Sequence, residues 1–247
     1  MDRHSPFFWS SASRTDTGKL RKHNEDNYLE LSKRGLWVVA DGMGGHQAGE
    51  IASATIVKTL EDMPPPVSLR SFVDEVEDRL LVCNSALREL AASRGPNQII
   101  GSTVVVLITY GKLAIYLWAG DCRLYRYRRG ELDQLTQDHT QVEEMVRMGL
   151  LEREAVRGHP NSNVVTRAVG AMNTLCMDLD VELVEAGDRF LLCSDGLDKE
   201  LEDTEIRDIL ADGGDTQVVD TLVGLALSRR GRDNITVVTA TAHCVAN

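Results

Sequence analysis

Apolar residues recur at helical spacing in four stretches of the chain, which predicts two pairs of helices. Residues 48–62 carry Ala52, Ile56 and Leu60 on one face, and a proline-rich break at 63–67 separates them from a longer amphipathic stretch. The apolar face of that second stretch consists of Val73, Val76, Leu80, Cys83, Leu87, Leu90 and Ala91. Residues 202–211 and 216–229 predict a second helical pair nearer the end of the chain.

Between these helices, runs of β-branched and large apolar residues bounded by Gly, Asn or Asp predict strands. The predicted strands are residues 35–40, 102–109, 112–119, 123–127, 188–194 and 235–240. Tight turns join several of them directly, which favours antiparallel pairing. Helices, then strands, then helices again predict an α+β fold in which helical layers lie outside packed sheets.

A length of 247 residues suits one domain, and no linker or internal repeat divides the chain. We therefore expect a single domain over residues 1–247, with a core from about residue 10 to about residue 242. Residues 140–163 are rich in charged side chains and have only short helical patches. This composition predicts a mobile flap subdomain over a cleft.

The net charge of −11 and the pI near 5.0 argue against a nucleic-acid-binding protein, because a phosphate backbone would be repelled. The basic stretch 123–129 alternates in a way that is more typical of a half-solvated strand than of a binding patch. The chain contains no run of 18 apolar residues, and the apolar start at residues 7–9 is too short for a signal peptide. We expect no membrane association and a cytoplasmic location.

The five cysteines are odd in number, scattered and without a C-x-x-C pair, so the sequence predicts reduced thiols and no zinc site.

Four aspartates, each beside a glycine or another turn-forming residue, are the main candidates for chemistry. They are Asp41 in DGMGGH, Asp121 in GDCR, Asp195 in SDG and Asp233 in RDN. Each follows or precedes a predicted strand, so we expect all four at strand ends, where carboxylates and backbone carbonyls can meet in one cleft. One such aspartate alone would be interpreted as a turn or helix-cap residue. Four together favour an oxygen-only site for Mg²⁺ or Mn²⁺.

A pair of such ions roughly 3.5–4 Å apart suits the in-line attack of water on phosphorus. Asp41 with the backbone carbonyl of Gly42, together with Asp195 and Asp233, would suffice to hold the pair. The sequence therefore predicts a metal-dependent hydrolase that needs no protein nucleophile.

Four further positions have two open interpretations each. Arg21 presents paired donors suited to a phosphate group, or is a surface arginine in a basic cluster. His46, in the glycine-rich loop, protonates a leaving alkoxide, or is merely exposed. The Asp138–Thr140 segment lies near the site, or caps the following helix. Cys122, next to Asp121, is an oxidisable thiol or an inert buried one.

The order of short motifs along the chain resembles that of the bacterial metal-dependent serine/threonine phosphatases of the type 2C family. The motifs are RKHNED at 21–26, VVADGMGGH ending at His46, GST at 101–103, AGDCR at 119–123, DHT at 138–140, VVTRAVG at 164–170, LLCSDGL at 191–197 and RDNITVV at 232–238. Each motif is weak alone, but the ordered set covers nearly the whole chain. The stretch around GLWVVADGMGGHQAGE is most similar to small phosphatases that accompany bacterial type VI secretion kinases.

This resemblance implies a four-layer α-β-β-α sandwich of two antiparallel sheets flanked by helical pairs. It implies that Asp41 bridges two Mn²⁺ or Mg²⁺ ions, that the Gly42 carbonyl binds one of them, and that Asp195 and Asp233 hold the other. Asp121 matches the aspartate that can bind a third ion together with Asp195. Arg21 matches a phosphate-binding arginine, and Asp26 matches an acidic residue that orients the attacking water. Family members usually have serine where Cys122 stands, which raises the hypothesis that this chain is redox-sensitive.

The predicted function is hydrolysis of phosphoserine and phosphothreonine by a water that bridges the metals, with Arg21 holding the phosphoryl oxygens. The partners expected are phosphoproteins and a serine/threonine kinase that the enzyme opposes, and we expect a monomer. Two alternatives stay open: a weakly active module that binds phosphoproteins, and a phosphatase of small phosphorylated molecules.

Overall fold

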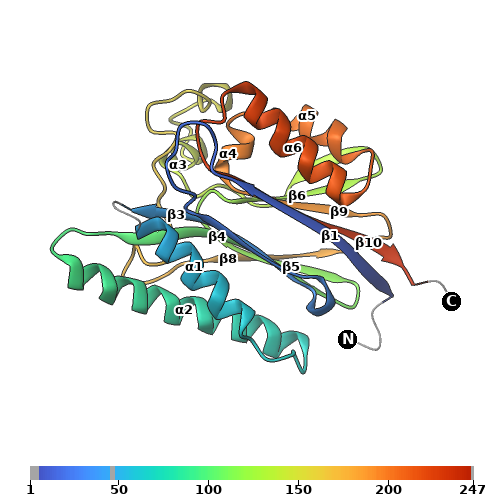
Figure 1. Ribbon diagram of the computed structural model, residues 1–247, viewed down its shortest axis with the longest axis horizontal. Coiled ribbons are helices and arrows are strands. Elements are labelled where there is room, and N and C mark those ends of the chain that lie inside the picture. Colours follow the sequence, from blue (N-terminus) through green and yellow to red (C-terminus); the bar gives the residue numbers. More distant parts are fainter. Residues whose placement is uncertain (1–5, 45–47, 246–247) are drawn as a thin grey trace.

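Two five-stranded antiparallel sheets pack face to face, and helices cover the outer face of each (Figure 1). The computed structural model describes residues 6–44 and 48–245. The predicted α+β class and the four-layer α-β-β-α arrangement are confirmed.

The first sheet has the order β1-β10-β9-β6-β7, and the second has the order β2-β3-β4-β5-β8. The strands of the first sheet are β1 (Phe7–Asp16), β10 (Ile235–Cys244), β9 (Arg189–Cys193), β6 (Arg123–Arg128) and β7 (Glu131–Gln134). The strands of the second sheet are β2 (Asp26–Leu31), β3 (Leu36–Gly44), β4 (Ile100–Tyr110), β5 (Leu113–Ala119) and β8 (Asp178–Leu183).

Two helical layers flank the sheets, as the apolar spacing predicts. Helices α1 (Ala48–Glu61) and α2 (Leu69–Arg94) cover the second sheet, and α5 (Asp203–Leu210) and α6 (Asp215–Arg229) cover the first. The remaining helical pieces are the short helices α3 (Gln141–Arg147) and α4 (Asp195–Asp198) and the 3₁₀ turns Ser32–Arg34 and Arg153–Ala155. Within residues 6–44 and 48–245, no helix combines the length and the apolar character that crossing a membrane requires.

Alternate residues of the central strands enter different layers of the core. In β3, Trp37 and Val39 pack between the sheets, whereas Val38 and Ala40 pack under α1 and α2. Because both faces of the central strands are covered, these strands are continuous apolar runs and are easy to recognise in the sequence.

The four strands that the apolar pattern does not predict are β1, β7, β2 and β8, which are the edge strands of the two sheets. Edge strands are half-solvated and carry polar or charged side chains, as in DNYLEL of β2 and DLDVEL of β8. They therefore lack the apolar run on which the prediction of the other strands rests.

The prediction that all four aspartates lie at strand ends is wrong for Asp41. Strand β3 continues past it to Gly44, so Asp41 is an internal residue that faces Asp26 on one side and Thr103 on the other in the strand register. Strand β3 continues beyond its apolar run because β2 and β4 still pair with it there. Asp121 follows β5 after Gly120, Asp195 opens α4, and Asp233 precedes β10 by two residues.

The basic stretch 123–129 forms β6 and the first residue of the turn after it, and its arginines are neutralised locally. Arg126 pairs with Asp133 and Glu182, and Arg128 pairs with Asp188. The interpretation as a half-solvated strand is confirmed.

Candidate active site

The predicted aspartates meet at one end of the sandwich, where both sheets contribute loops. Asp26, Asp121, Asp195 and Asp233 all lie close enough to Asp41 to raise the pKa of its carboxyl group well above its ordinary value, after burial as the main cause. Like charges at this density are unfavourable unless a cation or protons compensate for them.

The carboxylate of Asp26 is held by two hydroxyl groups from the opposite sheet. Ser194 Oγ and Thr236 Oγ1 each donate a hydrogen bond to Asp26 Oδ2 at 2.7 Å. Burial raises the pKa of Asp26 to about 7, with Asp195 and Asp233 adding to the shift and the two hydroxyl donors opposing it. The second oxygen, Oδ1, is buried without a hydrogen-bond partner among the described residues. Asp26 is therefore fixed in direction and keeps one acceptor for another group.

Gly42 lies where the backbone of α1 approaches β3 most closely. A Cβ atom at Gly42 would lie 2.1 Å from the carbonyl oxygen of Gly49 and 2.6 Å from that of Glu25. The Gly42 N–H also donates a hydrogen bond to the Glu25 oxygen at 3.1 Å. Only glycine fits this position. Packing alone therefore explains why Gly42 follows Asp41.

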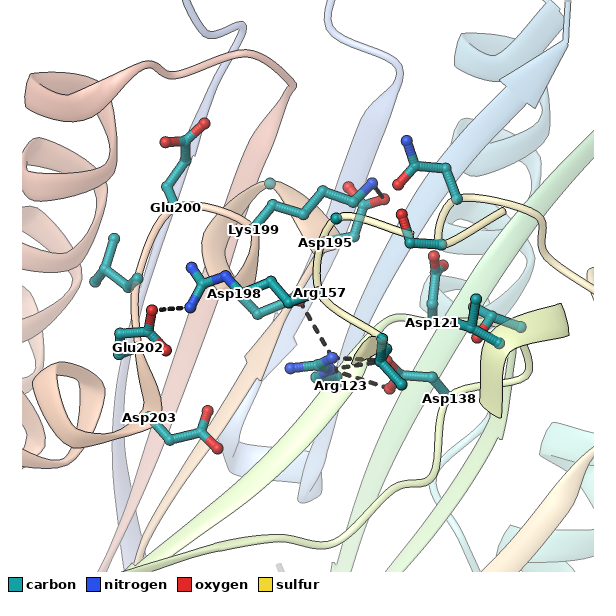
Figure 2. Close-up of a pocket in the computed structure, with 18 of the residues that line it drawn as sticks. Asp121, Arg123, Asp138, Arg157, Asp195, Asp198, Lys199, Glu200, Glu202 and Asp203 are labelled. Carbon is teal, nitrogen blue, oxygen red and sulfur yellow. Dashed lines mark hydrogen bonds and ion pairs between the residues drawn. The ribbon is translucent and has the colours of Figure 1, made fainter. Parts of the chain in front are cut away.

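Asp195 forms an ion pair with Lys199, one turn along the chain, and its Oδ1 is buried without a partner among the described residues. Burial raises the pKa of Asp121 well above its ordinary value, with Asp195 as the first charge that adds to the shift. Figure 2 shows the Lys199–Asp195 pair at the side of the pocket where Asp121 lies. These two carboxylates share one region, as the resemblance implies.

Arg21 binds Asp233 through two parallel contacts. Its Nε lies 2.7 Å from Asp233 Oδ1, and its Nη2 donates to Oδ2 at 2.7 Å. This paired geometry is also the one by which arginine binds a phosphoryl group. Arg21 is thus at the site and not an isolated surface residue, with about half of its side chain exposed.

A second acidic group lies beside Asp121 and Asp195, and sequence reasoning missed most of it. Arg123 donates to Asp138 at 2.7 Å and approaches Asp198 Oδ2 at 3.2 Å. Burial raises the pKa of Asp198 to about 7, and its Oδ1 has no partner among the described residues. Asp198 and Lys199 follow Asp195 at helical spacings of three and four, so the SDGLDK pattern could have revealed them.

Both interpretations of residues 138–140 are correct for different residues. Asp138 binds Arg123 at the pocket, whereas Thr140 caps α3 by accepting from the Glu143 N–H. His139 Nδ1 accepts a hydrogen bond from Gly120 N–H at 3.1 Å, so it supports the loop that carries Asp121.

A pocket of about 820 Å³ opens beside these groups (Figure 2). Asp121, Asp195 and Asp233 line it, and residues of the predicted flap, among them Arg153 and Arg157, line its other side. Arg157 forms an ion pair with Glu202 across the pocket.

The donor set fits divalent cations. Four buried carboxylate oxygens, on Asp26, Glu143, Asp195 and Asp198, have no partner among the described residues, and burial holds several carboxyl pKa values high. No group of three His, Cys, Asp or Glu side chains in these residues is arranged to enclose a metal ion by itself. The unpartnered carboxylate oxygens suit hard divalent cations, which bind oxygen ligands.

The two remaining candidates are His46 and Cys122. His46 lies outside the described residues. Cys122 is buried, 3.1 Å from Thr103 Oγ1, and burial raises the pKa of its thiol well above the ordinary value. A buried thiol of this kind is rarely ionised, which favours the inert interpretation.

Known proteins with similar sequences cover nearly the whole chain. The profile of the family described as Protein phosphatase 2C matches residues 19–219. Serine/threonine phosphatase stp of Listeria welshimeri is 34% identical over 232 residues, which is 91% of this chain and 92% of that protein. Protein phosphatase PhpP of Streptococcus pneumoniae is 36% identical over 236 residues, which is 90% of this chain and 93% of that protein.

Solved structures share the fold at similar coverage. PppA, described as a key regulatory component of the T6SS in Pseudomonas aeruginosa, has a TM-score of 0.89 and 43% identity, and covers 95% of this chain and 98% of its own. The catalytic domain of the serine threonine protein phosphatase PstP, in complex with 2 manganese ions, has a TM-score of 0.83 and 32% identity, and covers 96% and 99%. The chain described here belongs to the protein phosphatase 2C family.

Proposed function

We propose that this phosphatase removes phosphate from phosphoserine and phosphothreonine in proteins by direct attack of water, with two Mn²⁺ or Mg²⁺ ions as cofactors. The observation that carries the proposal is the cluster of buried, mutually repelling carboxylates around Asp41, since such a cluster is stable mainly when cations neutralise it. Asp41, the Gly42 carbonyl, Asp195 and Asp233 would hold the two ions, and Asp121 with Asp195 would hold a third. The two manganese ions in PstP support this assignment.

The bound cations would lower the pKa of a water molecule and neutralise charge at phosphorus. Asp26, fixed by Ser194 and Thr236, would orient the attacking water through its free Oδ1. Arg21 would exchange its paired contact with Asp233 for the phosphoryl oxygens. His46 is our candidate for the acid that protonates the leaving alkoxide.

Residues 140–163 would act as a flap subdomain of a single domain spanning residues 1–247. Several of them line the pocket, and the Arg157–Glu202 ion pair is their contact with the other wall. A flap in this place would contact the protein that carries the phosphate.

The phosphatase would oppose a cognate serine/threonine kinase as a cytoplasmic monomer. The role of PppA in the T6SS of Pseudomonas aeruginosa supports a place in the control of type VI secretion. The names of stp and PhpP support phosphoproteins as the substrate class.

The test is hydrolysis of a phosphothreonine peptide by the purified protein with Mn²⁺, with EDTA, and with the Asp195→Asn variant. We expect turnover with Mn²⁺ and loss of turnover in both controls. Turnover that persists in EDTA would contradict the metal-dependent mechanism. Turnover of small phosphate esters with none of phosphopeptides would favour a metabolite phosphatase.

A further inference from the structure

Two loops from opposite ends of the chain lie side by side at the mouth of the site. The Lys19 N–H donates a hydrogen bond to the Gly231 oxygen at 2.7 Å. Gly18, in the left-handed region at φ 77°, approaches so closely that a Cβ atom there would lie 2.1 Å from the carbonyl oxygen of Asp233. Residues 18–22 and 229–232 therefore form one continuous surface.

This surface concentrates positive charge on a protein whose net charge is −11. Its cations are Lys19, Arg21, Lys22, Arg229, Arg230 and Arg232. Arg21, Arg229 and Arg232 are paired with Asp233, Glu205 and Glu200, respectively.

The side chains of Lys19, Lys22 and Arg230 make no ion pair or hydrogen bond with any residue in the ranges 6–44 and 48–245, and all three residues are exposed. Two carboxylates that lie close by along the chain are already engaged, because Asp16 accepts from the Gly18 N–H and Asp233 binds Arg21. We call Lys19, Lys22 and Arg230 the basic rim.

The rim is continuous with the site. Arg230 lines the same pocket as Asp121, Asp195 and Asp233, and Lys19 and Lys22 flank Arg21 in one loop. An extended peptide advances about 3.3 Å per residue, so side chains two or three positions from a phosphorylated residue held at Arg21 come within reach of long basic side chains.

We propose that the basic rim binds acidic side chains that flank the phosphorylated serine or threonine, so that phosphoproteins with Asp or Glu near the phosphosite are the preferred substrates. This inference rests on the proposed function. Exposed charge contacts contribute modest affinity each, but they accelerate association and discriminate against partners of like charge. Because the chain as a whole carries a net charge of −11, a cluster of cations without ion pairs is a favourable place for an acidic substrate to dock.

The experiment compares phosphothreonine peptides that differ only in having glutamate, alanine or lysine at the flanking positions, with p-nitrophenyl phosphate as a small substrate. It uses the full chain, the double variant Lys19→Gln/Arg230→Gln, and the control Lys33→Gln/Arg94→Gln. Lys33 and Arg94 are also exposed, carry no ion pair among the described residues and do not line the pocket. The double variant and its control therefore remove the same amount of charge.

We expect the wild type to prefer the glutamate peptide over the lysine peptide by about tenfold or more in kcat/KM at low salt, with the preference fading at high salt. The rim variant should lose most of this ratio, and the control should keep it. Equal kcat/KM for the two peptides in the wild type, or a ratio retained in the rim variant, would overturn the proposal.

Failure of the proposed function gives a different pattern, in which neither p-nitrophenyl phosphate nor any peptide is hydrolysed. Fluorescence anisotropy of the same labelled peptides in EDTA then decides the role of the rim. Tighter binding of the glutamate peptide by wild type than by the rim variant supports the rim, and equal binding refutes it.

Discussion

The hydroxyl group of Ser194 donates a 2.7 Å hydrogen bond to Asp26 Oδ2 and so joins the two sheets at the site. Ser194 follows β9 of the first sheet, and Asp26 begins β2 of the second. The Ser194 Oγ also accepts from the Thr236 N–H at 2.9 Å, so one hydroxyl orients a carboxylate and a strand together.

The Ser194→Ala variant should lose both stability and the orientation of Asp26. A buried carboxylate and a buried N–H each lose a partner, which costs about 1–3 kcal/mol of unfolding free energy. The pKa of Asp26 should also rise further, because a donor that lowers it is removed. Urea unfolding in EDTA measures the first effect, and the pH profile of kcat measures the second. Ser228→Ala, on an exposed face of α6, is the control, and equal behaviour of the two variants would contradict the role of Ser194.

The metal-free protein should become more stable as the pH falls from about 8 to about 5. The pKa values of Asp26 and Asp198 are raised to about 7, whereas a carboxyl group in an unfolded chain titrates near 4. Between these values the folded chain binds more protons, so its unfolding free energy falls as the pH rises, and the contribution of Asp26 and Asp198 levels off above about 7.

Asp198→Asn tests the cause of this pH dependence. It removes one buried charge, so its metal-free melting temperature at pH 8 should exceed that of the wild type, and the difference should shrink towards pH 5. Circular dichroism melts in EDTA over this range measure both. A wild-type melting temperature that rises with pH would contradict the prediction.

Lys199→Gln should strengthen metal binding. The Lys199 ammonium pairs with Asp195, and its pKa is raised by Asp195 and Asp121, so it competes with any cation held there. We expect about a fivefold lower Kd for Mn²⁺, which corresponds to roughly 1 kcal/mol. Isothermal titration calorimetry measures the Kd, with Lys58→Gln on the exposed side of α1 as the control. Weaker binding by Lys199→Gln would show that the lysine supports the metal site.

Gly42→Ala should disrupt the junction of β3 and α1. The added methyl group would lie 2.1 Å from the Gly49 oxygen, so the backbone must move, and we expect a loss of about 2 kcal/mol or more in unfolding free energy. Thermal unfolding in EDTA detects this loss independently of catalysis. Gly224→Ala is the control, because a Cβ atom at Gly224 meets no atom within 4 Å.

Peroxide should inhibit the wild type and Cys122→Ser to the same extent. Cys122 is buried, and burial raises the pKa of its thiol, so little thiolate is available for oxidation. Phosphatase activity after peroxide treatment measures the effect. Protection by Cys122→Ser would restore the hypothesis that this thiol is redox-sensitive.

The sequence alone determined the four helices of the outer layers, because each repeats apolar residues along one face. It also determined the central strands, because residues such as Val38 and Val106 lie in continuous apolar runs that are buried on both faces. It also identified Asp41, Asp121, Asp195 and Asp233 as candidates, since each has a glycine or another turn-forming residue beside it and a recognisable apolar run nearby. The edge strands escaped prediction because half of their surface faces water and their apolar signal is diluted.

Tertiary structure alone decided which groups share the site, which hydrogen bonds they make and how their pKa values are shifted. Asp26 accepts hydrogen bonds from Ser194 and Thr236, which lie 168 and 210 positions away in the chain, and its raised pKa results from burial among carboxylates of other loops. The contact of residues 18–22 with residues 229–232 is equally remote in sequence. Hydrogen bonds, burial and charge density depend on how close residues lie in space. Local residue patterns do not determine the distance between residues of two different sheets.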